Sequence, residues 1–281
     1  MMLRRRFFVL RSNAVPSNEI WYTTSDGAVL AASSNSAFST GLVSNTYAGG
    51  KGVLRYSSPL TSLPTKMFYY CSKLTSITIG NSVTSVGTEA FAGCSGLKEV
   101  HISDLAAWCR IDFAAYRSNP LFHGKKLYLK NSLVTNLVIP SGITTIKKYA
   151  FRACESITSV TIPSSVTTID DYAFIHCTNL QSVVIPDSVT SIGGSAFEAT
   201  TTTNLTEVTI GGGVNNIGTN AFAHQKNLSK IYCKATTPPT VQSNIFVNVP
   251  TNCVVYVPTK DIGSYQVADY WKEMNLQGYD F

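Results

Sequence analysis

Apolar residues recur along most of this chain with a period of about 23 residues, and each period is marked by a Phe. The marker residues are Phe68, Phe91, Phe151, Phe174, Phe197, Phe222 and Phe246. Successive intervals are 23, 60, 23, 23, 25 and 24 residues, so one interval is much longer than the others. A unit of this length cannot bury its own apolar face and must share a continuous core with its neighbours. The period therefore predicts a solenoid.

Each unit contains a short stretch in which apolar and polar residues alternate. Residues 159–162 read Ser-Val-Thr-Ile, and Pro163 follows them. A period of two is typical of a strand with one buried and one wet face. Proline ends such a strand because its φ is fixed and it has no N–H to donate. Turn-prone residues then precede an Ala-Phe pair, which predicts one helical turn whose Phe fills the interior.

The run LTSITIGNSVTSVGTEAFAGCSGLKEV at residues 74–100 and its copies resemble the BspA-type leucine-rich repeat proteins. The resemblance covers roughly residues 52–258 in both spacing and residue type. It implies an α/β solenoid, a right-handed leucine-rich repeat superhelix of parallel strands with caps at both ends. It also implies a surface or secreted binding role in a bacterium.

Four segments are expected. Residues 1–18 form a basic, disordered tail, residues 19–52 a β cap, residues 53–258 the repeats with an insertion near 103–133, and residues 259–281 a helical cap. Caps are needed because the first and last coils would otherwise expose the shared core.

Both caps contain clusters of aromatic residues. In the first, Asp26-Gly27 is the expected turn of a hairpin between residues 20–22 and 29–30. In the second, Asp261 is the expected N-cap of an amphipathic helix that contains Tyr265 and Trp271. For Trp21 and Trp271 we favour a capping role over a ligand-binding role.

The interval from Phe91 to Phe151 exceeds two periods by 14 residues. A helix capped by Ser103 or Asp104 is expected to place Leu105, Trp108 and Cys109 on one face, followed by a hairpin around residues 130–132. Insertions in solenoids map to one face, which often binds a partner. Two roles stay open for residues 116–126, which either contact a partner or form a packed elaboration of the solenoid.

Composition and charge add little to the repeat pattern. The chain has 281 residues, 44% of them hydrophobic and 14% charged, with a net charge of +6. Part of that charge lies in residues 4–6 and Arg11, and the repeats contain no basic stripe interleaved with aromatic residues. We therefore expect no nucleic-acid partner.

The amino terminus does not meet the requirements of a secretory signal. Its basic start is followed by only four apolar residues, 7–10, before Arg11. No stretch has the ~20 apolar residues of a membrane helix, so no membrane insertion is expected. The surface location implied by the resemblance then requires a different start site or another export route. The alternative is a cytoplasmic or virion-associated protein.

Cysteines and histidines form no site that the spacing can identify. Cys71, Cys94, Cys154 and Cys177 each follow the repeat Phe by three residues, and Thr200 and Gln225 take that place in later copies. With no Cys-x-x-Cys pair, we expect reduced core thiols and no metal. We expect no catalytic residues and no cofactor, since the four histidines are scattered and no phosphate-binding loop is present.

The sequence thus predicts a non-catalytic recognition or adhesion module that binds a protein or a glycan, as a monomer or weak oligomer. The wet strand face and the insertion supply the candidate binding residues, which are Glu99, His101, Asn136, Glu207, Lys230, Tyr232 and Tyr116. The alternative is a structural or assembly component, for example of a phage particle or a surface appendage.

Overall fold

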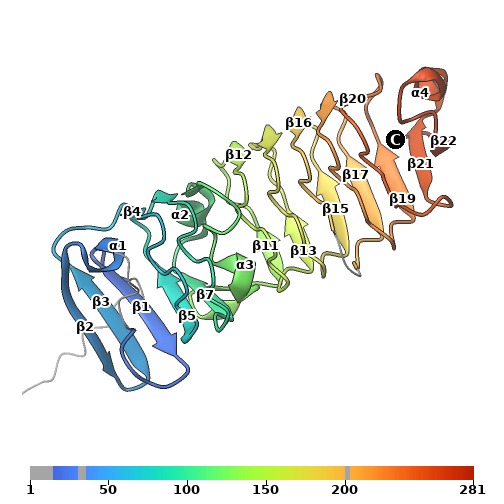
Figure 1. Ribbon diagram of the computed structural model, residues 1–281. Coiled ribbons are helices and arrows are strands. Elements are labelled where there is room, and N and C mark those ends of the chain that lie inside the picture. The colour runs from blue at the N-terminus through green and yellow to red at the C-terminus, as the bar shows by residue number, and fades with distance from the viewer. Residues whose placement is uncertain (1–14, 31–35, 200–202) are drawn as a thin grey trace, which may run out of the picture.

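The computed structural model describes residues 15–30, 36–199 and 203–281. In these residues the chain forms a row of stacked coils with a cap at each end (Figure 1). Each regular coil contributes one strand to a main sheet and one shorter strand to a second sheet. This arrangement confirms the expected solenoid of parallel strands. Arg4, Arg5, Arg6, Arg11 and Thr200 lie outside the described residues.

The longer strands form two seven-stranded sheets. In spatial order the first contains β10 (Ser132–Leu133), β9 (Lys126–Leu129), β7 (Glu99–Ile102), β5 (Leu74–Ile79), β1 (Glu19–Thr24), β3 (Lys51–Tyr56) and β2 (Leu42–Ala48). The second contains β11 (Asn136–Val138), β13 (Ser159–Thr161), β15 (Ser182–Ile185), β17 (Glu207–Ile210), β19 (Lys230–Cys233), β21 (Val254–Pro258) and β22 (Asn275–Tyr279).

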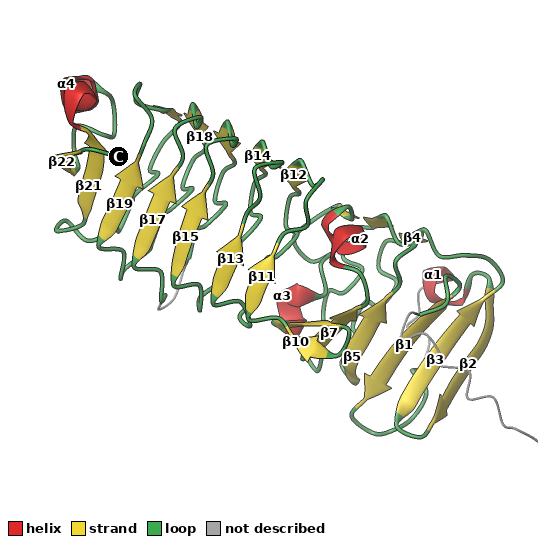
Figure 2. Cartoon of the chain, turned by 180° about the vertical axis from the view of Figure 1, so that it is seen from behind, coloured by secondary structure: helices red, strands yellow, loops and turns green. Residues whose placement is uncertain are grey.

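The shorter strands form a five-stranded and a three-stranded sheet. The former contains β12 (Thr145–Ile146), β14 (Thr168–Ile169), β16 (Ser191–Ile192), β18 (Asn216–Ile217) and β20 (Thr240–Val241). The latter contains β4 (Ser62–Leu63), β6 (Ser85–Val86) and β8 (Asp112–Phe113). Figure 2 shows how little helix the coils contain, and the helices are α1 (Ser36–Ser39), α2 (Leu105–Cys109), α3 (Leu121–Gly124) and α4 (Ile262–Val267).

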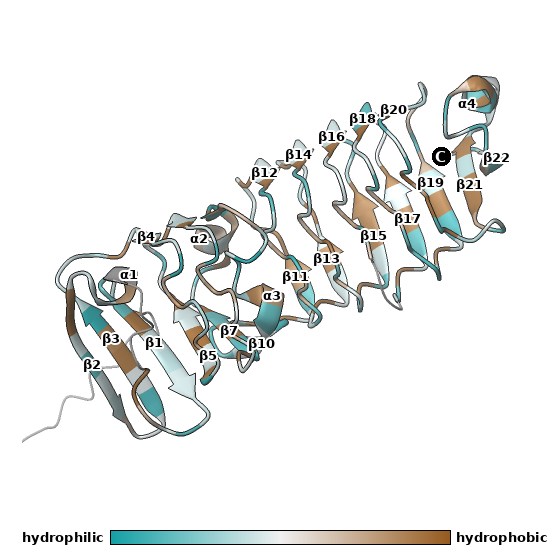
Figure 3. Cartoon of the chain, in the orientation of Figure 1, coloured by the Kyte–Doolittle hydropathy of each residue, from teal (hydrophilic) through white to brown (hydrophobic). Residues whose placement is uncertain are grey.

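Equivalent residues of successive coils lie opposite one another. Ser159 pairs with Ser182 and Val160 with Val183 between β13 and β15. Because side chains alternate along a strand, the inward residues of each coil stack on the same residues of the next coil. The main strands accordingly show both hydrophobic and hydrophilic bands in Figure 3.

The repeat Phe residues form a stacked column in the core. The ring centroids of Phe174 lie 5.4 Å from Phe151 and 5.2 Å from Phe197, and all three side chains are buried. The backbone of the same residue also joins coils, because Phe174 N–H donates to the Ala196 carbonyl of the next coil at 2.8 Å. Phe174 therefore links its coil to the following one by packing and by a hydrogen bond, and Phe68, Phe151, Phe197 and Phe222 do the same.

The insertion interrupts this pattern and replaces the missing contacts with side chains. The coil before Phe151 has no repeat Phe whose N–H could donate to the Ala150 carbonyl. Trp108 Nε1 and Asn119 Nδ2 donate to that oxygen instead, at 3.0 and 3.1 Å. Asn119 also donates to the Tyr149 carbonyl at 2.8 Å. The core thus continues across the insertion although the repeat does not.

The expected helix and hairpin of the insertion are confirmed. Asp104 caps α2 by accepting from the N–H groups of residues 106 and 107, and Leu105, Trp108 and Cys109 are buried. β9 and β10 form an antiparallel hairpin whose two turn residues, Lys130 and Asn131, both have positive φ. Helix α3 was not expected from the sequence.

The amino-terminal cap differs from the expected hairpin. β1 does not pair with residues 28–30 but lies between β3 and β5, antiparallel to both. Both of its edges are occupied in this way, so a local partner strand has no edge to join. The hairpin of the cap is β2–β3, which turns at Gly49 and Gly50 with positive φ.

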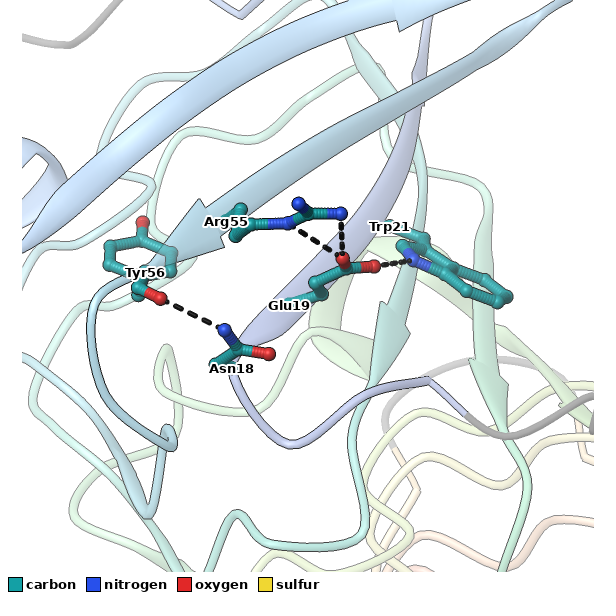
Figure 4. A network of polar contacts seen from close by, with 5 residues as sticks. All are labelled: Asn18, Glu19, Trp21, Arg55 and Tyr56. Atoms are coloured by element: carbon teal, nitrogen blue, oxygen red, sulfur yellow. Dashed lines mark hydrogen bonds and ion pairs between the residues drawn. The ribbon is translucent and has the colours of Figure 1, made fainter.

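A buried carboxylate fixes the start of β1. Glu19 is 8% exposed and accepts from Trp21 Nε1 at 2.8 Å and from Arg55 Nε and Nη2 at 3.0 and 2.8 Å (Figure 4). Asn18, which we placed in the tail, donates to the Tyr56 carbonyl at 3.0 Å. These bonds orient Trp21 on the outer face of β1.

The carboxy-terminal cap contains both a helix and an unexpected strand. Tyr265 and Trp271 are fully buried, donate to the carbonyls of Ala235 and Pro239, and Trp271 packs edge-on against Phe246. They close the end of the Phe column, so Trp271 is a capping residue. Asp261 lies at the N-cap position of α4 as expected, but its side chain makes no capping hydrogen bond, and a 3₁₀ turn over Thr259–Asp261 leads into the helix. β22 follows and pairs with β21.

Replacing a Phe of the column should destabilise the whole chain. For Phe174→Ala we expect a loss of ~3 to 5 kcal/mol in the free energy of unfolding, because a cavity opens between two stacked rings. Thr161→Ala, at an exposed position of β13, is the control and should cost less than about 0.5 kcal/mol. Urea melts followed by circular dichroism measure both, and equal losses would show that the repeat is oriented wrongly.

Asn119 should contribute strongly to stability although it lies in the insertion. Asn119→Ala leaves the Tyr149 carbonyl without this donor and the Ala150 carbonyl with Trp108 alone, and we expect a loss of about 2 to 3 kcal/mol. Asn204→Ala removes an exposed amide that donates to the Asn179 side chain and serves as the control. If the two variants unfold at the same urea concentration, Asn119 does not stabilise the junction between the insertion and the following coil.

Candidate binding surface

The outward residues of the main strands form one surface, which we call the strand face. On β19, for example, Ile231 and Cys233 point into the core while Lys230 and Tyr232 point outward. Its first-sheet residues are Trp21, Thr23, Ser76, Thr78, Glu99, His101, Lys126 and Tyr128. Its second-sheet residues are Asn136, Val138, Ser159, Thr161, Ser182, Val184, Glu207, Thr209, Lys230, Tyr232, Val254 and Tyr256.

Six of the seven residues predicted to bind a partner lie on the strand face, in two groups. Glu99 and His101 belong to the first sheet. Asn136, Glu207 and the β19 pair belong to the second sheet. The hairpin β9–β10 ends the first sheet, so these groups are separated by a break in the strand order.

The group on the first sheet is a fixed aromatic and acidic cluster. His101 stacks on Tyr128 with ring centroids 4.6 Å apart and planes at 12°. Glu99 contacts both residues. One of its oxygens lies 3.2 Å from His101 Nε2, and the other accepts from the Tyr128 hydroxyl at 3.4 Å. Trp21 lies in the same row, opposite Thr78, with Lys51 Nζ 3.6 Å from its ring centroid.

Desolvation, and then the neighbouring Glu99 carboxylate, raise the pKa of Tyr128. Its hydroxyl therefore stays protonated at neutral pH and keeps donating to Glu99.

The group on the second sheet is larger and more aromatic, and it is centred on β19, away from Asn136 on β11. Tyr232 stacks on Tyr256 at 4.8 Å, and Tyr279 packs edge-on against both at 5.5 and 5.6 Å. Phe281 extends the cluster at 5.0 Å from Tyr279, and its side chain is half exposed. Beside these rings, Glu207 lies opposite Lys230 in the register.

The strand face between the two groups is made of small residues. Ser159, Thr161 and Ser182 present hydroxyls, while Val138 and Val184 are 53% and 60% exposed. The groups with the greatest capacity to discriminate a partner therefore flank this stretch, one on β7 and β9 beside the break and the other on β19, β21 and β22 at the carboxy-terminal end.

Sequence reasoning missed Lys126, Tyr128, Tyr256 and Tyr279. The first three had a visible signal, because KLYL and VVYV alternate as EVHI does in β7. They were not identified because the long interval hid the register of β9 and the cap was taken to be helical.

Tyr116 lies on the insertion and not on the strand face. Its side chain is 41% exposed, and its ring is 5.7 Å from Phe122. The guanidinium carbon of Arg152 is 5.3 Å from the Tyr116 ring and 5.2 Å from the Phe122 ring. Arg152 is only 9% exposed, and its guanidinium group packs against both rings. This contact fastens the insertion to the repeat that follows it.

Comparison with known sequences identifies the family. A family model described as the BspA type leucine rich repeat region matches residues 54–114 and 124–252 in six copies. The chain belongs to the BspA-type leucine-rich repeat family. None of the curated proteins matches this sequence.

Several solved structures resemble this BspA-type protein. A leucine rich cell surface protein of Faecalibacterium prausnitzii A2-165 is 18% identical over 84% of this chain and 86% of its own, with a TM-score of 0.35. The T. pallidum leucine rich repeat protein is 24% identical over 77% and 75%, with a TM-score of 0.34. The pneumococcal vaccine antigen PcpA is 15% identical over 80% and 72%, with a TM-score of 0.43.

In the part of this BspA-type chain that the structure describes, no helix combines the length and apolar character needed to cross a membrane. Across the same ranges no three His, Cys, Asp or Glu residues are grouped so that they could hold a metal ion.

The repeat cysteines of the BspA-type chain have a structural role that the sequence did not reveal. Cys94 Sγ donates to the Phe68 carbonyl of the preceding coil at 3.0 Å, and Cys177 Sγ to the Phe151 carbonyl at 3.1 Å. Gln225 occupies the same place and donates to the Phe197 carbonyl. At three copies of this position the side chain thus donates to the preceding coil, whereas Cys154 Sγ lies 3.4 Å from Ser156 Oγ. All seven cysteines are free thiols.

Raising the pH should destabilise the protein through these thiols. Burial raises the pKa of Cys71 and Cys154 from 9.0 to about 11. A raised native pKa stabilises the fold fully below about pH 9, where unfolded thiols are protonated too. This contribution is lost progressively as the pH rises toward 11. Desolvation raises the pKa of Tyr56 and Tyr265 as well, which adds to the effect in the same direction.

Urea melts at pH 7 and pH 10 would measure the loss, and a Cys94→Ala variant should lose less between these values than the wild type. A thiol reagent such as DTNB should label the cysteines at pH 8 only as fast as the protein unfolds. Rapid labelling of the native protein, or equal stability at both pH values, would contradict the assignment.

Proposed function

We propose that the chain is a non-catalytic recognition module of a bacterial surface or secreted protein, and that it binds a protein or a glycan through the strand face. The observation that carries the proposal is the pair of rigid aromatic and charged groups that flank the stretch of small residues on this face. They are His101 with Tyr128 and Glu99, and Tyr232 with Tyr256 and Lys230.

Stacked rings suit recognition for an energetic reason. Aromatic side chains offer a large contact area and lose little conformational entropy on binding, and these rings are already held in one orientation by their neighbours. Charges beside them discriminate between partners by complementarity. The hydroxyls and valines between the two groups permit close approach of an extended partner.

Family membership supports the surface location, and one of the solved relatives is described as a cell surface protein.

Two double substitutions test the strand face. Glu99→Ala with His101→Ala, and Lys230→Ala with Tyr232→Ala, should each weaken binding at least about tenfold, because each removes the charge and a stacked ring from one group. Ser159→Ala with Thr161→Ala, on the middle of the same face, is the matched control. Purified protein would be screened on a glycan array and an array of extracellular host proteins, and the variants titrated against each hit.

Wild-type binding by both test variants would refute the proposal, provided that all variants melt at the wild-type temperature. Tyr116→Ala with Arg117→Ala then asks whether the insertion binds instead. Deleting the insertion is unsuitable, because Asn119 holds the following coil. Mass photometry tests the assembly alternative, which a stable and defined oligomer would support.

A further inference from the structure

The two main sheets part at the insertion, and a cleft of about 300 Å³ lies at this break. β10 pairs with the edge of β9 that would otherwise face β11, so β11 has no strand neighbour on that side. The walls come from both sides of the break, with Lys98, His123 and Lys126 on one side and Glu155 and Ser156 on the other.

Hydrogen bonds across the break hold the walls in place. Ser156 N–H donates to the Lys125 carbonyl at 3.2 Å, and Leu127 N–H donates to Ser156 Oγ at 3.2 Å. Lys125 Nζ and Glu155 Oε1 form an ion pair at 2.6 Å. Asn179 Nδ2 donates to the Glu155 carbonyl at 2.7 Å and secures the far wall. The cleft is therefore a built feature of the fold and not a gap between loose loops.

The charge of the cleft is positive and only partly neutralised. Three lysines face one glutamate in its lining, and Glu155 is occupied by Lys125. Among the described residues, no hydrogen bond or ion pair joins the side chain of Lys98 or Lys126 to another group. Glu99 lies opposite Lys126 in the register, but its oxygens contact His101 and Tyr128 instead. Two ammonium groups at the rim are thus available to an external anion.

The remaining lining limits the size and nature of a ligand. His123 forms part of the wall, and its Nε2 is buried with no hydrogen-bond partner among the described residues. Burial, and then the charge of Arg117, lower the pKa of His123, so its ring stays neutral at physiological pH. Leu133, which is 42% exposed, adds an apolar wall. The volume is at the low end of the range for ligand pockets, which corresponds to one small group.

We propose that the cleft binds an oxyanion-bearing group of monosaccharide size, held by Lys98 and Lys126. Lysines act as point charges with rotatable donors and accept carboxylate, sulfate and phosphate alike, so the shared chemistry is the oxyanion. The low-dielectric walls focus the field of the two ammonium groups on the opening. This site shares Lys126 with the edge of the strand face, but it does not depend on the aromatic groups proposed to bind a partner there.

The test uses glucuronate as the carboxylate probe, glucose 6-phosphate and galactose 6-sulfate as the ester probes, and glucose as the neutral control. Isothermal titration calorimetry and ligand-detected NMR with the full chain should show at least one anionic sugar binding about tenfold more tightly than glucose. The difference should shrink as the salt concentration rises. The probe that binds best distinguishes a carboxylate ligand from a sulfate or phosphate ester.

Lys98→Ala with Lys126→Ala should abolish the preference for the anionic sugar. Lys226→Ala with Lys260→Ala removes the same charge from exposed positions away from the cleft and should change the affinity by less than twofold. Leu133→Trp, which fills the cleft without altering charge, should block binding as well. The proposal is overturned if no anionic sugar binds better than glucose, or if the two lysine pairs weaken binding equally, since the attraction would then come from the net charge alone.

Discussion

Stacking of like residues in register is the constraint on which the structure depends. Each coil is too small to have a core of its own, so every inward side chain must fit against the same position of the coils before and after it. The Phe column shows this most directly, because within each run of regular coils the rings stack on one another and the Phe N–H groups, as in Phe174 and Phe197, donate to the following coil. The cysteine position obeys the same rule, since Cys94, Cys177 and Gln225 all donate to a Phe carbonyl of the preceding coil.

The same constraint explains how the insertion is tolerated. A coil without the repeat Phe leaves the Ala150 carbonyl without its usual donor, and a buried carbonyl that lacks a partner is costly. The side chains of Trp108 and Asn119 donate to this carbonyl instead. Arg152 also packs against the rings of Tyr116 and Phe122. The insertion thus avoids the cost of a buried carbonyl without a hydrogen-bond partner. The other cost, the break in the strand order, remains visible on the surface as a cleft between the two sheets.

The positions that can vary between coils are those that do not have to stack in the core. Inward positions are restricted to residues that stack, so differences between coils concentrate on the strand face and at the break. There the chain has its stacked tyrosines, its His101 and Glu99 pair, and the cleft lysines Lys98 and Lys126. The stacked rings and the His101 and Glu99 pair are held by their neighbours, so these groups have little conformational entropy to lose in a contact.

The sequence alone determined the repeated part of the molecule, because a 23-residue period with alternating strands has one way to bury its apolar positions. It also predicted α2 with Asp104 as its cap, the β9–β10 hairpin and the outward direction of residues such as Glu99 and Lys230, all of which depend on local pattern. Tertiary structure decided the rest. The pairing of β1 between β3 and β5, the strand β22, and the stacking of Tyr128 on His101 join residues from different segments, and no local pattern records which edges or rings will meet.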